Sequence, residues 1–148
     1  ILEHMKIKMK ILREAAILPS YQTHGAACMD LHASIDAPVV LQPGQYSAVP
    51  TGVAAEIPEG HELQVRARSG WAAKHGIGLV NGIGTIDADY RGEIAAILIN
   101  WGTEPFTIKP GERIAQIMLN KIEKVDWEVV EQLSDTERGE GKFGSTGR

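Results

Sequence analysis

Short apolar and alternating segments recur along the chain and are separated by glycine and proline turns. Basic and apolar residues alternate over 6–15, and Leu63, Val65 and Ala67 alternate with polar neighbours. A period of two is typical of a strand with one buried face. Further strands are predicted at 30–35, 39–41, 46–57, 94–99, 106–108, 114–121 and 127–133. Short strands, frequent turns and almost no helix predict an antiparallel all-β sandwich or jelly roll.

Two segments depart from this alternation. Residues 69–76 have the composition of a short helix, in which Ser69 can cap the start and Gly76 can end it. Residues 94–99 are apolar on both faces. We therefore expect this strand to be covered on both sides, either by a second sheet or by another subunit.

Length and composition narrow the class of protein. The chain has 148 residues and a formal net charge of -4. The length suits one domain, and the negative charge argues against a nucleic-acid partner. Cys28 is the only cysteine, so no internal disulfide can form and a reducing, cytoplasmic compartment is expected. No apolar run reaches membrane-spanning length, so no membrane partner is expected.

The two ends differ from the rest of the chain. Residues 1–5 are expected to be a cloning remnant, and residues 6–133 the folded domain. Residues 134–148 are rich in glycine and hold too little apolar area to order themselves. Such a tail is either a frayed terminus or an arm that orders on binding. Its arginines, its single aromatic residue and its hydroxyl groups favour the arm, which is expected to be flexible.

Residues 84–93 read as a tight polar turn between two apolar runs. Asp87 and Asp89 are either solvated turn residues or, for one of them, a base that activates a water molecule. Tyr90 offers a flat face to a sugar, and Asn81 offers a donor and an acceptor that suit a pyrimidine edge. We expect a hairpin pocket for a nucleobase and sugar, with Asp87 as the general base.

Two further positions suit a phosphorylated ligand. At Arg68-Ser69-Gly70 a strand ends and a helix begins, where free N–H groups and an arginine favour an anion. An ordinary helix start beside a surface arginine is the alternative. Asp30 can hold a hydrated Mg²⁺ whose other ligands are phosphate oxygens, and otherwise it is a polar residue at a strand end.

The remaining reactive and aromatic side chains predict no site of their own. The histidines show no metal-ligand spacing and are expected to be surface or hydrogen-bonded residues. The three tryptophans, Trp71, Trp101 and Trp127, are expected to be packing residues.

Five segments taken together resemble, in order, the five motifs of the homotrimeric deoxyuridine triphosphate nucleotidohydrolases, the dUTPases. These segments are Ala27–Ala33, Arg68–Ala72, Asn81–Glu93, Gly111–Gln116 and Arg138–Gly147. The chain departs from the family pattern at Cys28 and Met29, where glycine and an aromatic residue are common. It departs again at Trp71, where leucine is common.

The resemblance implies a jelly-roll (β-clip) subunit with one short helix, in a homotrimer whose sites lie at subunit boundaries. It implies a dUTP diphosphatase, which cleaves dUTP to dUMP and pyrophosphate, keeps uracil out of DNA and supplies dUMP for thymidylate synthesis. Asp87 would deprotonate the water that attacks the α-phosphorus. Asp30 would hold the cofactor Mg²⁺ through water.

The same resemblance implies the contacts with dUTP. Asn81 and the backbone of the hairpin would read uracil, and Tyr90 would pack on deoxyribose and reject a 2′-hydroxyl. The hairpin residues implied are Gly84, Thr85, Ile86 and Asp87. The phosphate contacts implied are Arg68, Ser69, Gly70 and Gln116. The arm would close over the site with Phe143 above uracil and, near the γ-phosphate, Arg138, Gly144, Ser145 and Thr146.

Two other functions compete with this one. A deoxycytidine triphosphate deaminase shares this fold and several motifs, but its catalytic glutamate lies on the strand after the hairpin, where this chain has Ile97. A non-catalytic nucleotide-binding trimer would bind dUTP without releasing pyrophosphate. Asp87 argues against it, because a protein that only binds needs no base at that position.

Overall fold

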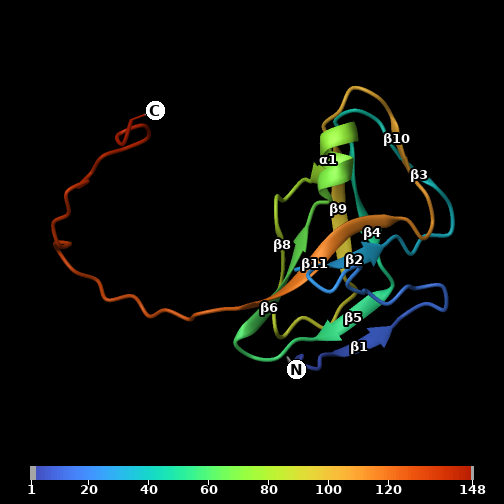
Figure 1. The fold of residues 1–148 in the computed structure, drawn as a ribbon, viewed down its shortest axis with the longest axis horizontal. Coiled ribbons are helices and arrows are strands. Elements are labelled where there is room, and N and C mark those ends of the chain that lie inside the picture. The colour runs from blue at the N-terminus through green and yellow to red at the C-terminus, as the bar shows by residue number, and fades with distance from the viewer. Residues whose placement is uncertain (1–2, 148) are drawn as a thin grey trace.

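The structure, a computed structural model, describes residues 3–147 and is built almost entirely from strands (Figure 1). One short helix, α1 (Ser69–His75), interrupts them. The strands are β1 (Lys8–Ile11), β2 (Met29–His32), β3 (Val39–Leu41), β4 (Tyr46–Pro50), β5 (Val53–Glu56), β6 (His61–Arg66), β7 (Ile77–Leu79), β8 (Gly84–Ile86), β9 (Ala95–Asn100), β10 (Phe106–Ile108) and β11 (Arg113–Lys121). The predicted all-β class with one short helix is confirmed.

Two larger sheets enclose the hydrophobic core. The first has the order β2-β11-β6-β8 and the second the order β4-β9-β7, while β1 pairs with β5 and β10 with β3. All these pairs are antiparallel. Leu31 and Ile117 from the first sheet and Val49 and Leu98 from the second lie in one buried cluster. The inward-facing residues of the alternating strands therefore meet between the sheets, as the pattern predicts.

Strand β9 is covered largely from within the chain. It lies between β4 and β7, and Ala96, Leu98 and Ile99 are buried. The strand ends at Asn100, a fully buried polar residue whose amide donates to the carbonyl oxygens of Leu41 and Glu104. A second sheet, one of the two expected alternatives, thus covers the face of β9 that carries Ala96 and Leu98, whereas Ile97 and Ile99 on the other face lie outside the core cluster.

The expected tight turn at 84–93 is wrong in one respect. The two flanking runs do pair, because β7 lies antiparallel to β9 with Leu79 opposite Leu98. However, the chain between them crosses to the other sheet, where β8 pairs with β6. Gly84 permits this crossing, since a β-carbon there would lie 3.0 Å from Cβ of Val65. The connection is a long loop with a strand of its own, not a hairpin turn.

Helix α1 begins differently from the prediction and ends as predicted. Arg68 occupies the N-cap position with extended backbone angles, and no side chain caps the helix. Ser69 is already the first helical residue, so its expected capping role is wrong. Gly76 ends the helix with φ 68°, the left-handed conformation that glycine adopts without strain. A β-carbon there would also lie 2.8 Å from the backbone nitrogen of Gly102.

After β11 the chain leaves the folded body as an extended arm (Figure 1). The strand predicted at 127–133 is not formed in the single chain, where Trp127 is 88% exposed and Val129 95% exposed. The alternating pattern is present, but no neighbouring strand supplies hydrogen bonds. Trp127 does not pack within the single chain for the same reason, so its expected packing role stays a prediction. The expected division into residues 1–5, 6–133 and 134–148 stays a prediction.

Candidate functional site

A polar pocket lies where β2 and β11 meet the start of α1. It has a volume of about 310 Å³ and is lined by His32, Arg68, Trp71, Gly111, Glu112 and Arg113. We call it the arginine pocket. The Arg68 guanidinium donates from Nη1 to the Arg113 carbonyl oxygen at 2.9 Å. Nη1 of Arg113 in turn lies 3.5 Å from Oδ2 of Asp30.

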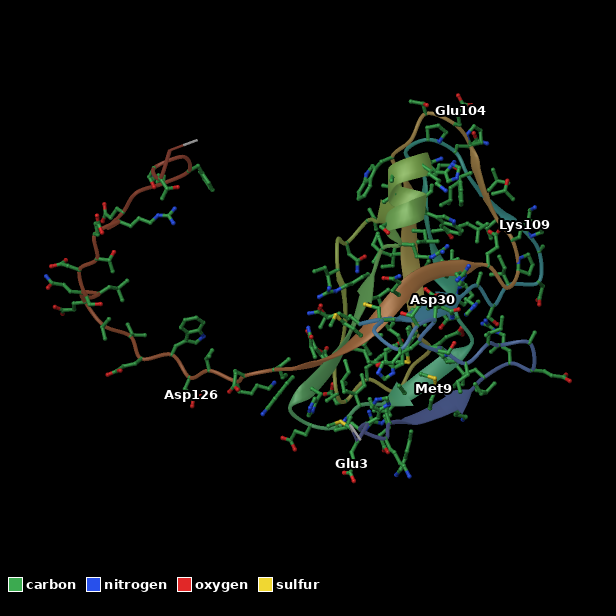
Figure 2. The ribbon with its side chains drawn as sticks, viewed as in Figure 1. Glu3, Met9, Asp30, Glu104, Lys109 and Asp126 are labelled. Carbon is green, nitrogen blue, oxygen red and sulfur yellow. The ribbon has the colours of Figure 1, made fainter. Side chains whose placement is uncertain are left out.

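Asp30 is the buried member of this group. It is only 6% exposed and lies on β2, within the folded body (Figure 2). Gln116 on β11 is its partner in the sheet register. Burial of a carboxylate is costly unless a cation or hydrogen bonds compensate it, and Arg113 supplies the cation. The structure therefore brings Asp30 and Gln116 to the region where Arg68, Ser69 and Gly70 begin the helix.

The arginine pocket is locally positive in a chain of negative net charge. Arg68 and Arg113 both line it, whereas Oε2 of Glu112 accepts a hydrogen bond from the backbone N–H of Lys109 and closes its own turn. Ser69 and Gly70 are exposed beside it. The arrangement suits an anionic ligand and provides the local positive charge that an acidic chain needs for one.

The pKa of the His32 imidazole is shifted by its surroundings in the pocket. Burial lowers the pKa of its imidazole from the ordinary value, and the nearby Arg113 and Arg68 act in the same direction, against the opposing effect of Asp30. Its Nδ1 is buried and has no hydrogen-bond partner among residues 3–147. The expectation that every histidine is a surface or hydrogen-bonded residue is therefore wrong for His32.

The second group of candidate residues lies in the loop 81–93. Asn81 lies beside Gly84, where a β-carbon would come within 3.6 Å of its Nδ2. The Tyr90 hydroxyl donates to the Glu93 carbonyl oxygen at 2.8 Å, and its ring covers Gly92. Asp87 is exposed, and its backbone carbonyl accepts the N–H of Tyr90. The loop thus presents a free carboxylate beside an anchored tyrosine.

Several residues that hold this loop in place escaped sequence reasoning. Oε1 of Glu93 lies 2.8 Å from Nη2 of Arg13, and its Oε2 accepts the Gly52 N–H at 3.0 Å. Arg91 donates to the Ala88 carbonyl oxygen at 2.6 Å. Glu93 and Arg91 lie inside the third motif, and Arg113 lies inside the fourth. Motif membership was the available signal, but their roles depend on contacts distant in sequence.

The two groups lie at opposite edges of one sheet. Asp30 is on the edge strand β2, and Asp87 follows the edge strand β8. In the strand register, Asp30 is opposite Gln116, which is in turn opposite Arg66, while Ile86 is opposite Leu63. Three strand spacings and about four residues along the strands separate the two carboxylates by roughly 20 Å. A single chain does not bring them to one phosphate group.

The arm residues reach neither group. Phe143 is fully exposed, and Nε of Arg138 donates to the Gly141 carbonyl oxygen within the arm itself. Gly144 has φ 78°, and its carbonyl accepts the N–H of Gly147, so this end of the arm is folded into local turns. Ser145 and its neighbours are therefore exposed and available to a ligand, but no described contact places them at either group.

The residues present fit a magnesium ion only if the substrate provides most of its ligands. Among residues 3–147 no group of three or more His, Cys, Asp or Glu side chains lies close enough to hold a metal ion. Mg²⁺ is usually bound through one or two carboxylates together with phosphate oxygens and water. Asp30, a buried carboxylate beside the arginine pocket, meets that description.

Comparison with known proteins identifies the family. The family model named dUTPase matches residues 14–147. The chain belongs to the dUTPase family. It is 49% identical to the deoxyuridine 5'-triphosphate nucleotidohydrolase of Fusobacterium nucleatum, an alignment covering 97% of this chain and 99% of that protein. It is 50% identical to the protein of the same name from Anaplasma marginale, over 95% of this chain and 99% of that one.

Solved dUTPase structures confirm the jelly-roll-like fold. The dUTPase of Staphylococcus bacteriophage 80alpha, solved with dUpNHpp, matches 97% of this chain and 99% of its own with a TM-score of 0.87 at 27% identity. The dUTPase from phage phi11 of S. aureus matches 89% of this chain and 100% of its own, with a TM-score of 0.79 at 22% identity. Among the helices that the model describes, none is long and apolar enough to cross a membrane.

The lowered pKa of His32 predicts an acid-sensitive contribution to stability. As pH falls below about 6.5, the unfolded chain protonates this histidine more readily than the folded protein does. The folded state is therefore progressively destabilised on the acid side. We expect His32→Gln to lose less thermal stability than the wild type between about pH 7 and pH 5. Melting temperatures measured across this range test the expectation.

His24→Gln is the matched control, because His24 is exposed in a loop. It should follow the wild-type pH dependence. Parallel curves for the wild type and His32→Gln would show that His32 does not contribute.

Proposed function

We propose that this protein is a dUTP diphosphatase that hydrolyses dUTP to dUMP and pyrophosphate in the cytoplasm. The observation that carries the proposal is that Asp87, in the third motif of a chain of the dUTPase family, presents an exposed carboxylate. Relatives that cover almost its whole length bear the name of this activity. The reaction keeps uracil out of DNA and supplies dUMP for thymidylate synthesis.

The loop 81–93 is assigned to the nucleoside. Asn81 and the backbone of 84–86 hydrogen-bond the uracil edge, and the closeness of the loop around C5 excludes thymine. Tyr90 packs on deoxyribose and leaves no room for a 2′-hydroxyl. Its hydroxyl is already bound to the Glu93 carbonyl, and Glu93 is fixed by Arg13, so the ring is held before the substrate arrives.

The arginine pocket and its neighbours are assigned to the phosphates. Arg68, Ser69, Gly70 and Gln116 contact the triphosphate. Charge on the phosphate oxygens in the transition state is stabilised by groups already in position, which is the main source of rate in phosphoryl transfer. Asp30 holds a hydrated Mg²⁺ that, when bound, neutralises negative charge on these oxygens.

Asp87 supplies the chemistry that positioning alone does not. Its carboxylate accepts a proton from a water molecule, whose oxygen then forms a bond to the α-phosphorus. The bond between the α-phosphorus and the bridging oxygen breaks, and pyrophosphate leaves. The arm 134–148 closes over the site, with Phe143 on uracil and Arg138, Gly144, Ser145 and Thr146 near the γ-phosphate, and excludes bulk water.

The active site is shared within a homotrimer. Asp87 must reach a water on the α-phosphorus while Asp30 reaches the metal on the same triphosphate, yet one chain separates them by roughly 20 Å. Two different subunits resolve this mismatch. The exposed apolar residues Val125, Trp127 and Val129 alternate along the extended segment between β11 and the arm. They offer a further surface for a neighbouring subunit.

Replacing the general base should separate binding from turnover. Asp87→Asn keeps the shape of the side chain but cannot accept the proton. We expect kcat for pyrophosphate release from dUTP to fall by about 10²- to 10⁴-fold, with KM changed little. A pyrophosphate-release assay on purified protein, with and without Mg²⁺, measures both constants.

Asp89→Asn is the matched control, since Asp89 lies in the same exposed turn and should retain near wild-type turnover. Wild-type turnover by Asp87→Asn would remove it as the base. The same assay run on dCTP, dTTP and UTP tests selectivity. Ammonia released from dCTP would favour the deaminase, and dUTP binding without pyrophosphate release would favour the regulatory trimer.

A shared site predicts complementation between inactive subunits. Asp30→Asn and Asp87→Asn each damage every site in a pure trimer. In a ring of subunits, each site takes Asp30 from one subunit and Asp87 from its neighbour. When the two variants are mixed in equal amounts, each of these residues is intact in about half of cases, so about one quarter of the sites are intact. Unfolding the two variants together and refolding them should therefore recover about one quarter of wild-type activity.

Each variant refolded alone provides the baseline. Activity that stays at the sum of the two baselines would place both carboxylates in a site formed by one chain.

Removing the arm should impair activity and leave the fold intact. Truncation after Glu137 deletes the residues assigned to the γ-phosphate and to uracil. We expect turnover to fall by about 100-fold, because charge stabilisation and water exclusion are both lost. Thermal unfolding should be unchanged, since this stretch lies apart from the folded body (Figure 1). A large fall in melting temperature would contradict its role as a lid.

A further inference from the structure

Arg68 is held between an aromatic ring and a carbonyl group. Its Cζ lies 5.6 Å from the centroid of the Trp71 ring, within the range of a cation–π interaction. Its Nη1 donates to the Arg113 carbonyl oxygen at 2.9 Å. A long, flexible side chain is thus restrained at one face of its charged end by the ring and at one N–H by the carbonyl, while most of its N–H groups remain available to a ligand.

Trp71 is itself fixed by residues that do not line the pocket. Its ring meets Phe106 on β10 edge to face, with centroids 4.7 Å apart and an interplanar angle of 66°. Phe106 also contacts the His75 ring at 5.0 Å. The small sheet of β3 and β10 therefore supports α1, and α1 supports the face on which Arg68 rests.

An aromatic partner has an advantage over a carboxylate at this position. Within residues 3–147 no carboxylate lies within ion-pair distance of Arg68. An acidic partner would cancel the positive charge that a phosphate needs. The ring orders the guanidinium and leaves its charge intact. It also offsets the repulsion from Arg113, which lines the same pocket.

We propose that Trp71 is a positioning residue that holds Arg68 ready for the triphosphate. The inference rests on the proposed function, because it takes the ligand of Arg68 to be the phosphate chain of dUTP. Leucine, common in the family at this position, could fill the space but offers no π face. The tryptophan therefore adds an ordering contact for the phosphate-binding arginine that leucine would not provide.

The test compares Trp71→Leu with Trp71→Phe in the pyrophosphate-release assay. Loss of the cation–π contact should raise KM for dUTP by about two- to five-fold in Trp71→Leu. Arg68 keeps its charge and its hydrogen bond to the Arg113 carbonyl, and Asp87 is untouched, so kcat should stay within about two-fold of the wild type. Trp71→Phe keeps an aromatic face and should recover part of the lost affinity.

A double variant shows whether Trp71 acts through Arg68. Arg68→Met removes the charge and keeps the length of the side chain. If the inference holds, adding Trp71→Leu to Arg68→Met raises KM no further. A multiplicative increase in the double variant would show that Trp71 acts by another route and would overturn the proposal, as would an unchanged KM in Arg68→Met.

Two controls separate this effect from damage to the fold. Trp101→Leu removes a tryptophan that is 62% exposed and lies outside the pocket, and it should leave KM unchanged. Melting temperatures identify any variant that is destabilised. Wild-type protein that releases no pyrophosphate would refute the proposed function. Active wild-type protein with an unchanged KM in Trp71→Leu would refute the inference alone.

Discussion

The pairing of β8 with β6 determines where the chemistry of this protein can take place. It draws the loop 81–93 out of the sheet that contains β7 and β9 and fixes it at the edge of the other sheet. Gly84 is the residue that permits it, because Val65 occupies the space that a side chain there would need. The opposite edge of that sheet carries Asp30. The width of one sheet therefore separates Asp87 from Asp30, and the proposal of a site shared between subunits rests on this separation.

The charges at the arginine pocket follow from a second constraint, the burial of the Asp30 carboxylate. Asp30 is buried, and a buried carboxylate needs a partner, which Arg113 provides. The backbone carbonyl of Arg113, which lies in β11, also receives the Arg68 guanidinium, so the same residue orders a second cation. His32, with its pKa lowered by burial, adds little charge near neutral pH. An acidic chain thus brings two guanidinium groups, those of Arg68 and Arg113, to one pocket.

Patterns of local sequence predicted the parts of this fold that depend on local physics. Alternation placed Leu63 and Val65 in the core, and the left-handed conformation explains why Gly76 ends the helix. The three-residue strand β8 carries no such pattern, because only its contact with β6 makes it a strand. The strand expected at 127–133 has the pattern but lacks a partner in the single chain. The five motifs identified the candidate residues, whereas the anchoring of the loop through Glu93 depends on contacts distant in sequence and could not be predicted from local pattern.

In the proposed trimer, this arrangement would couple assembly to activity. A site completed by another subunit needs the two halves at a fixed distance, and each half is fixed in its own chain before assembly. The loop is anchored through Arg13 and Glu93, and Arg68 through Trp71 and Arg113. Because both halves are already ordered, docking of subunits need only align two rigid surfaces, and little side-chain entropy remains to be lost when dUTP binds. The arm is the exception. It is exposed and extended, and in the proposed function its ordering is the step that the substrate induces.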